Sequence, residues 1–183
     1  TGGQSILSYC RAELWAALAS TAETISSQLM GPWSAILSPA PKHVSATSKR
    51  WIAWRAGTDS PSIPPSTRFN LPPECFVAQR TFAWVYWVDE HFQHFGRPQG
   101  ESLQRIVANL TFLSAHRISQ GRHLLKLNQL ICGSLLQARP DVVGVLESEG
   151  AAFLKVQRLA DLPVAPLNSA ASAQDEWSHH GIC

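Results

Sequence analysis

The chain has 183 residues, of which 45% are hydrophobic and only 15% are charged. This length suits one domain with its own core, and the apolar fraction excludes a disordered chain. The longest apolar run, Phe82 to Val88, is far too short to span a bilayer, so membrane insertion is not expected. Because soluble domains typically carry about 25% charged residues, we expect part of this surface to be hidden against partners.

Charge is distributed unevenly along the chain. Residues 1–41 sum to −1, residues 42–139 to +7 and residues 140–183 to −4. A basic middle favours contact with a polyanion, although the same charges could equally be scattered over a solvated surface. The four cysteines are widely separated, which is typical of buried thiols in a reducing compartment.

The first predicted helix covers residues 5–29, where apolar side chains recur at helical spacing until Gly31-Pro32. Residues 31–45 are predicted as a loop and residues 46–56 as a short segment. An irregular, proline-rich connector follows at residues 57–73.

The second long helix is predicted from Pro73 to about Phe95 and is the most apolar of the chain. Aromatic side chains fall on nearly every side of it, so we expect more than one of its faces to be covered. Trp84 and Trp87 are therefore candidate subunit-interface residues.

Three further helical segments are predicted at residues 101–119, 122–139 and 140–159, and no segment alternates in polarity for long enough to predict a strand. The sequence thus predicts an all-α, four-helix-bundle-like domain over residues 1–162. A flexible tail rich in proline, alanine and serine is predicted at residues 163–183.

The chain has no GxSxG, P-loop or GxGxxG motif, so neither an enzyme nor a bound cofactor is expected. His91 and His94 share a helix face and could ligate a metal, but no local cluster supplies a third ligand. The alternative for this pair is a polar position near a helix end. An α-helical metalloenzyme using the two histidines remains a third interpretation.

The arginines are more informative than the histidines. Residues 97–139 contain six basic groups and one acidic group. Arg97 lies in a predicted turn, and Arg117 and Arg122 lie on the next two helices. Guanidinium groups at the ends of an α-hairpin can bind phosphate as a fork, but they could also simply face water.

Short motifs follow one another between residues 68 and 156. They are Arg68-Phe69 with Phe76, then Phe95-Gly96-Arg97, Leu113-Ser114-Ala115-His116-Arg117, Leu130-Ile131 with Leu135, and Leu146-Glu147-Ser148 leading to an apolar end. This order resembles the coat proteins of rod-shaped plant RNA viruses, of tobamovirus and furovirus type. Two residues depart from the family pattern, because Leu146 stands where a Phe is usual and Val156 where a Trp is common.

The resemblance implies a structural capsid protein that assembles with copies of itself into a helical rod around single-stranded RNA. Such a protein would occupy the virion and the host cytoplasm. Arg68, Arg97, Arg117 and Arg122 would contact the RNA.

The resemblance also places Glu147 and Glu149 at a subunit boundary. Like charges brought together there would disfavour ionisation, so rods should lengthen in mild acid and loosen in alkali. The alternative is that both carboxylates are solvated or paired with Lys155 and Arg158.

A second class of function explains the low charge, the proline-rich connector and the absence of catalytic motifs equally well. It is a non-catalytic accessory subunit of a large organellar, for example mitochondrial, protein or ribonucleoprotein complex. Only the basic middle of the chain favours the coat protein over this alternative.

Overall fold

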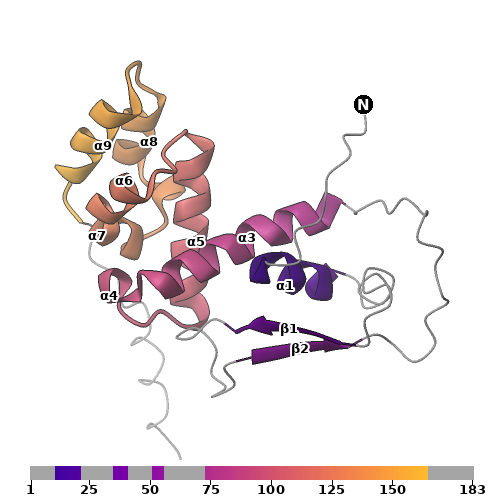
Figure 1. The fold of residues 1–183 in the computed structure, drawn as a ribbon. Helices are drawn as coiled ribbons and strands as arrows, with labels where there is room; N and C mark the ends of the chain where they lie inside the picture. Colours follow the sequence, from indigo (N-terminus) through magenta and orange to yellow (C-terminus); the bar gives the residue numbers. More distant parts are fainter. Residues whose placement is uncertain (1–10, 22–34, 41–50, 56–72, 165–183) are drawn as a thin grey trace, which may run out of the picture. The chain divides into compact units, whose positions relative to one another are not determined.

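The computed structural model describes residues 11–21, 35–40, 51–55 and 73–164. Helices dominate these residues, which confirms the predicted all-α class (Figure 1). The chain divides into two compact units, Thr1–Thr111 and Phe112–Cys183, and the division falls inside helix α5 (Gly100–Ala115). The bundle arrangement and the single domain over residues 1–162 stay predictions. Of the predicted tail, only Pro163 and Val164 are among the described residues.

The core of the first unit lies between α1 (Ala12–Thr21) and α3 (Pro73–Glu90). Leu14 and Leu18, one helical turn apart on α1, are buried in one cluster with Cys75 of α3. Pro73 begins α3, where its missing N–H costs no hydrogen bond. The helix predicted at residues 5–29 is confirmed over α1, and its other residues lie outside the described ranges.

The helix predicted from Pro73 to about Phe95 is two helices. α3 ends at Glu90, and the amide of His91 is shared between the carbonyl oxygens of Trp87 and Val88, both at 3.1 Å. The short helix α4 (Phe92–Phe95) follows. Gly96 then ends α4 with φ 72°, a left-handed conformation that glycine adopts without steric cost.

Two short strands, which the sequence did not predict, form a hairpin-like pair. β1 (Ala35–Pro39) and β2 (Trp51–Arg55) run antiparallel, with Ala35 opposite Arg55. The Tyr86 hydroxyl of α3 donates a hydrogen bond of 2.8 Å to the Pro39 carbonyl oxygen. The prediction of a loop over residues 31–45 was therefore wrong for β1. Strand pairing depends on a distant partner rather than on local pattern, which explains the error.

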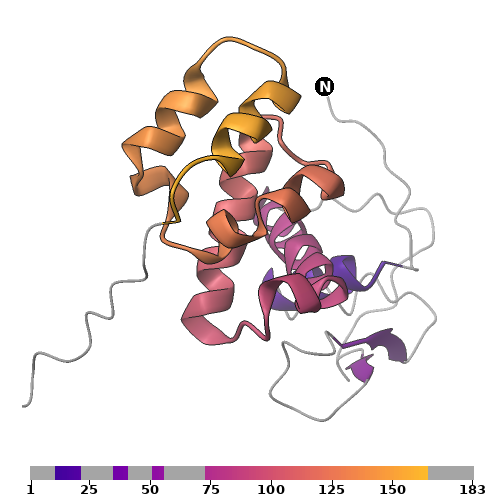
Figure 2. The same ribbon diagram turned by 90° about the vertical axis from the view of Figure 1, so that its left-hand side faces the viewer.

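The second unit contains short helices around a leucine-rich core (Figures 1 and 2). They are α6 (Gly121–Lys126), α7 (Asn128–Cys132), the 3-10 helix η1 (Leu136–Ala138), α8 (Pro140–Glu147) and α9 (Ala152–Ala160). The side chains with 2% exposure or less include Leu113, Ile118, Leu124, Leu127, Ile131, Leu136, Leu146 and Leu159. Both α6 and α8 contact α9.

The prediction of one continuous helix at residues 122–139 and another at residues 140–159 was wrong, because both segments are interrupted. The first is interrupted at Leu127 and again after Cys132, so it becomes α6, α7 and η1. A side chain at Gly133 would meet the Leu130 carbonyl oxygen at 3.2 Å, which explains why this turn holds a glycine. The second is divided at Ser148–Ala151, where Gly150 has φ 133°.

Candidate nucleic-acid interface and assembly surface

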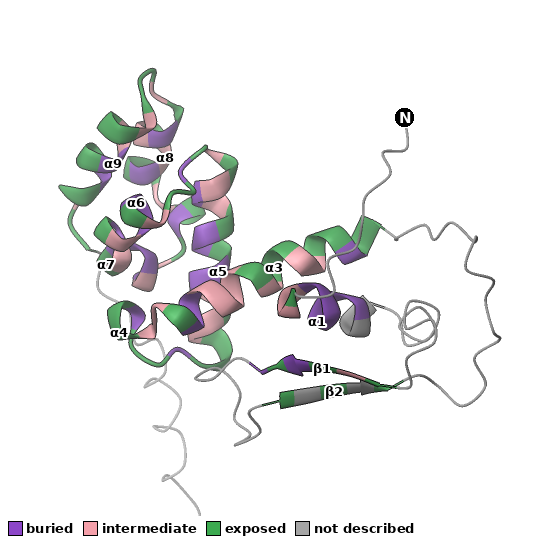
Figure 3. Ribbon diagram, in the orientation of Figure 1, coloured by how far each residue is buried: buried purple, intermediate pink, exposed green. Residues whose placement is uncertain are grey.

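Helix α3 has two apolar faces, and only one of them is covered by α1. Cys75 is buried against α1, with Ala78 and Phe82 packed beside it. Phe76 and Val77 point away from this core and are 50% and 57% exposed. Figure 3 shows exposed and half-buried residues along α3. The expectation that more than one face of this helix is covered stays a prediction.

An aromatic row continues from α3 into α4. The rings of Trp84 and Trp87 meet edge to face with centroids 6.0 Å apart, and His91 stacks on Trp87 at 4.5 Å. The Phe95 ring also meets Trp87 edge to face, with ring centroids 5.5 Å apart. Both tryptophans are half-buried, so neither indole is fully in water. Their predicted role at a subunit interface stays a prediction.

His91 and His94 do not form a built metal site. The Nδ1 atom of His91 lies 2.9 Å from the Trp87 carbonyl oxygen, which fixes Nδ1 as the protonated nitrogen when the ring is neutral. The centroids of the two imidazole rings are 6.5 Å apart. Within the described ranges, no three His, Cys, Asp or Glu side chains come together to hold a metal ion.

Arg97 follows Gly96 in the turn between α4 and α5, as predicted, and is exposed. Its guanidinium carbon lies 6.0 Å from the centroid of the Phe92 ring, within reach of a cation–π contact. Pro98, the next residue of this turn, is buried. Arg68, the fourth predicted RNA contact, lies outside the described residues.

Arg117 and Arg122 flank the turn between α5 and α6 in the second unit. The Arg117 amide donates to the Ser114 carbonyl and the Ile118 amide to the Leu113 carbonyl, both at 3.0 Å, which is a Schellman motif. Arg117 occupies its left-handed position with φ 64°, where glycine is usual. Arg122 is exposed and donates from Nε to Gln120 Oε1 at 3.1 Å. Both guanidinium groups therefore face solvent.

The sequence interpretation missed a second cation–π contact. The Lys126 ammonium nitrogen of α6 lies 5.9 Å from the centroid of the Phe153 ring of α9. Phe153 is 50% exposed although it belongs to an amphipathic helix. The sequence gives no signal for this contact, because residues 27 positions apart form no local pattern.

Glu147 and Glu149 are exposed at and just beyond the end of α8. In the described part of the chain, neither carboxylate forms an ion pair. The Lys155 ammonium group instead donates to the Leu146 carbonyl oxygen at 2.6 Å and so caps the end of α8. Among the described residues, neither Glu147 nor Glu149 is paired with Lys155 or Arg158, and their place at a subunit boundary stays a prediction.

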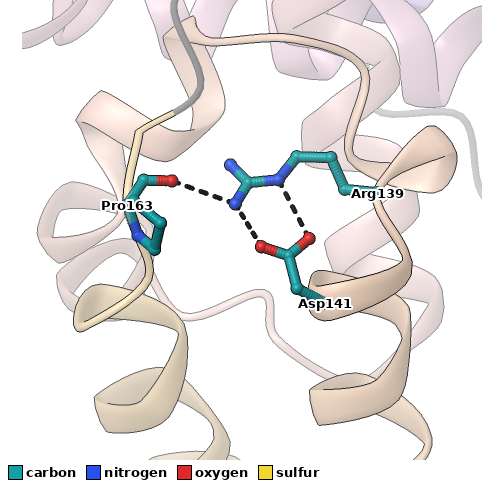
Figure 4. Close-up of polar contacts among 3 residues, drawn as sticks. All are labelled: Arg139, Asp141 and Pro163. Atoms are coloured by element: carbon teal, nitrogen blue, oxygen red, sulfur yellow. Dashed lines mark hydrogen bonds and ion pairs between the residues drawn. The ribbon is translucent and has the colours of Figure 1, made fainter.

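A fork of hydrogen bonds from Arg139, also missed in the sequence, joins two ends of the second unit (Figure 4). Arg139 Nε donates to Asp141 Oδ1 at 3.1 Å, and Nη2 bonds both Asp141 Oδ2 and the Pro163 carbonyl oxygen. These bonds from Arg139 hold the pKa of Asp141 below its usual value. The guanidinium group of Arg139 therefore binds within the second unit, to Asp141 and Pro163.

No protein-family model matches the chain, and no curated protein or solved structure matches it significantly. The resemblance to coat proteins noted in the sequence is therefore untested by these comparisons.

None of the helices among the described residues is both long and apolar enough to cross a membrane. The described surface offers exposed apolar side chains on α3 and α9, and exposed guanidinium groups at Arg97, Arg117 and Arg122.

Proposed function

We propose that this chain is a structural coat subunit that assembles with copies of itself into a helical rod around single-stranded RNA. The observation that carries the proposal is the second apolar face of α3. Phe76 and Val77 are exposed there, opposite the face that packs on α1. Exposed apolar side chains gathered on one face are typical of a protein–protein contact, and a neighbouring copy would cover them.

A second exposed apolar side chain supports repeated assembly. Leu154 on α9 is 48% exposed. Contact between two different surfaces of identical copies is heterologous, and such contacts build a filament when their rotation does not close a ring. The proposed assembly uses the α3 face in one such contact and places the protein in the virion and the host cytoplasm.

Charge supports RNA as the second partner. No Asp or Glu occurs between Glu101 and Asp141, a stretch that includes Arg117 and Arg122. Among the described residues, Arg97, Arg117 and Arg122 have no carboxylate within ion-pair distance. Unneutralised guanidinium groups of this kind bind phosphate and release counterions from the nucleic acid.

The proposal is tested by the assembly state of the pure chain. We expect sedimentation and electron microscopy to show rods or discs, which single-stranded RNA lengthens. Phe76→Ser with Val77→Ser should suppress assembly while circular dichroism and thermal unfolding stay unchanged. The matched control is Leu37→Ser, which alters an equally exposed apolar side chain on β1. A chain that stays monomeric at all concentrations, with or without RNA, contradicts the proposal and favours an accessory subunit.

A separate variant tests the RNA-binding part of the proposal. Arg97→Ala should weaken RNA packaging to a similar extent for all sequences, and it should reduce the salt dependence of binding by about one charge. Unchanged packaging by this variant would exclude Arg97 as a phosphate contact.

A further inference from the structure

Helix α6 presents two cations on its surface. Arg122 and Lys126 are four residues apart, so they lie on the same face of the helix, and both are exposed. Among the described residues, neither has an ion-pair partner. The next base along the chain, Arg139, is by contrast bound to Asp141. The face of α6 therefore carries two positive charges available to an anion.

An aromatic ring lies beside these cations. α9 packs on α6 and brings Phe153 to Lys126, with 5.9 Å between the ammonium nitrogen and the ring centroid. Half of the Phe153 surface remains exposed, so the ring contacts Lys126 without being buried by it. Phe153 lies one helical turn before the buried Val156, at the edge of the face that α9 packs on the core, so one part of the ring is buried and the rest is open to a ligand.

We propose that Arg122, Lys126 and Phe153 form a nucleotide subsite for single-stranded RNA. The two cations bind phosphate oxygens of the backbone, and an unpaired base stacks on the Phe153 ring. Cations that follow the backbone and aromatic rings that stack the bases are the general means of binding single strands. This inference rests on the proposed function, since it names where on the second unit the RNA would bind.

The ring distinguishes RNA from an acidic protein segment as the occupant. A run of carboxylates would satisfy Arg122 and Lys126 but would have no group with a π-face to place on Phe153. A single-stranded nucleic acid supplies phosphates and flat bases at regular intervals, so it matches all three side chains.

The experiment measures binding of a fluorescein-labelled twelve-nucleotide single-stranded RNA to the full chain by anisotropy, over a series of salt concentrations. We expect Phe153→Ala and Phe153→Leu to weaken binding about fivefold or more, because both remove the ring. Phe153→Tyr keeps a ring and should bind normally. Arg122→Gln and Lys126→Gln should each weaken binding and reduce the salt slope by about 0.7.

The matched control is Arg158→Gln, which removes the same charge from an exposed position on α9, five residues from Phe153. It should leave the affinity nearly unchanged, and circular dichroism should show every variant folded. Unchanged binding by both Phe153→Ala and Phe153→Leu overturns the subsite. A second result would also overturn the subsite: an oligoglutamate binds as tightly as the RNA, and the Phe153 variants weaken the binding of neither ligand. That result would indicate an acidic protein partner.

Failure of the subsite and failure of the proposed function give different results. If the unaltered chain binds the RNA and only Arg97→Ala weakens that binding, the subsite is wrong and the coat proposal stands. If the unaltered chain binds no RNA at any salt concentration, the proposed function itself fails.

Discussion

Among the residues that the structure describes, Arg117 is the non-glycine residue with a left-handed backbone. It takes the left-handed position at the end of α5, with φ 64°, while Leu113 and Ile118 close the motif as fully buried neighbours. A side chain in this conformation costs about 1 kcal/mol relative to glycine. A costly residue retained at an exposed position agrees with a binding role for its guanidinium group.

Arg117→Gly should therefore raise the free energy of unfolding by about 1 kcal/mol, because it removes the steric cost without disturbing the buried pair. Chemical denaturation measures the change. Arg122→Gly is the control of opposite sign, since glycine inside α6 should cost about 0.5–1 kcal/mol. Loss of stability in both variants would show that the conformation of Arg117 is not strained.

At the scale of elements, the Arg139 fork joins the start of α8 to the chain that leaves α9. The pKa of Asp141 is lowered chiefly by its hydrogen bond from Arg139. A lowered pKa in the folded state means that the ionised carboxylate stabilises the fold. This contribution is present above the ordinary value of 3.8 and is lost as the pH falls through the lowered pKa.

Asp141→Asn should accordingly unfold at a lower temperature than the unaltered chain at pH 6, and the difference should shrink towards pH 2. Because the carboxylate is partly exposed, we expect a difference of about 1 kcal/mol or less. Thermal unfolding monitored by circular dichroism gives the comparison. Adding Arg139→Gln closes a double-mutant cycle, and strictly additive effects would refute the coupling.

Local pattern predicted those elements whose burial follows from their own sequence. α5 is the clearest case, because Ile106, Val107 and Leu110 are buried on the face that their spacing indicated. β1 and β2 depend on each other rather than on alternation, so the sequence did not reveal them. The break of residues 122–139 was missed because apolar spacing continues through Leu127 while the backbone turns.

Part of the candidate site could be predicted from the sequence, and part could not. The exposed positions of Arg97, Arg117 and Arg122 follow from a turn and two helix ends, which the sequence indicates. The proximity of Lys126 to Phe153 arises from packing of α6 on α9 and leaves no trace in spacing. The fork from Arg139 likewise needs the distant Pro163 carbonyl.

At the scale of the whole molecule, we propose that the acidic end of α8 links assembly to pH. Glu147 and Glu149 are exposed, and no ion-pair partner for either lies among the described residues. If neighbouring copies bring these carboxylates close, the assembly binds more protons than the free subunits, so contacts strengthen in acid and weaken as the pH rises.

Glu147→Gln should then move the midpoint of assembly towards higher pH, because the repulsion between carboxylates is reduced. Light scattering during a pH titration measures the midpoint. Arg158→Gln, which changes a nearby charge of opposite sign, controls for net charge. An unmoved midpoint would show that Glu147 is not at the subunit boundary.

The cap that Lys155 places on α8 also gives the two lysines of this unit different chemical reactivity. The Lys155 ammonium group is half-buried and held by the Leu146 carbonyl, whereas Lys126 is exposed. An amine reagent can reach Lys155 only when the turn between α8 and α9 opens, whereas it can react with Lys126 directly. The ratio of the two labelling rates, read by mass spectrometry, therefore reports how often this turn opens while the rest of the unit stays folded.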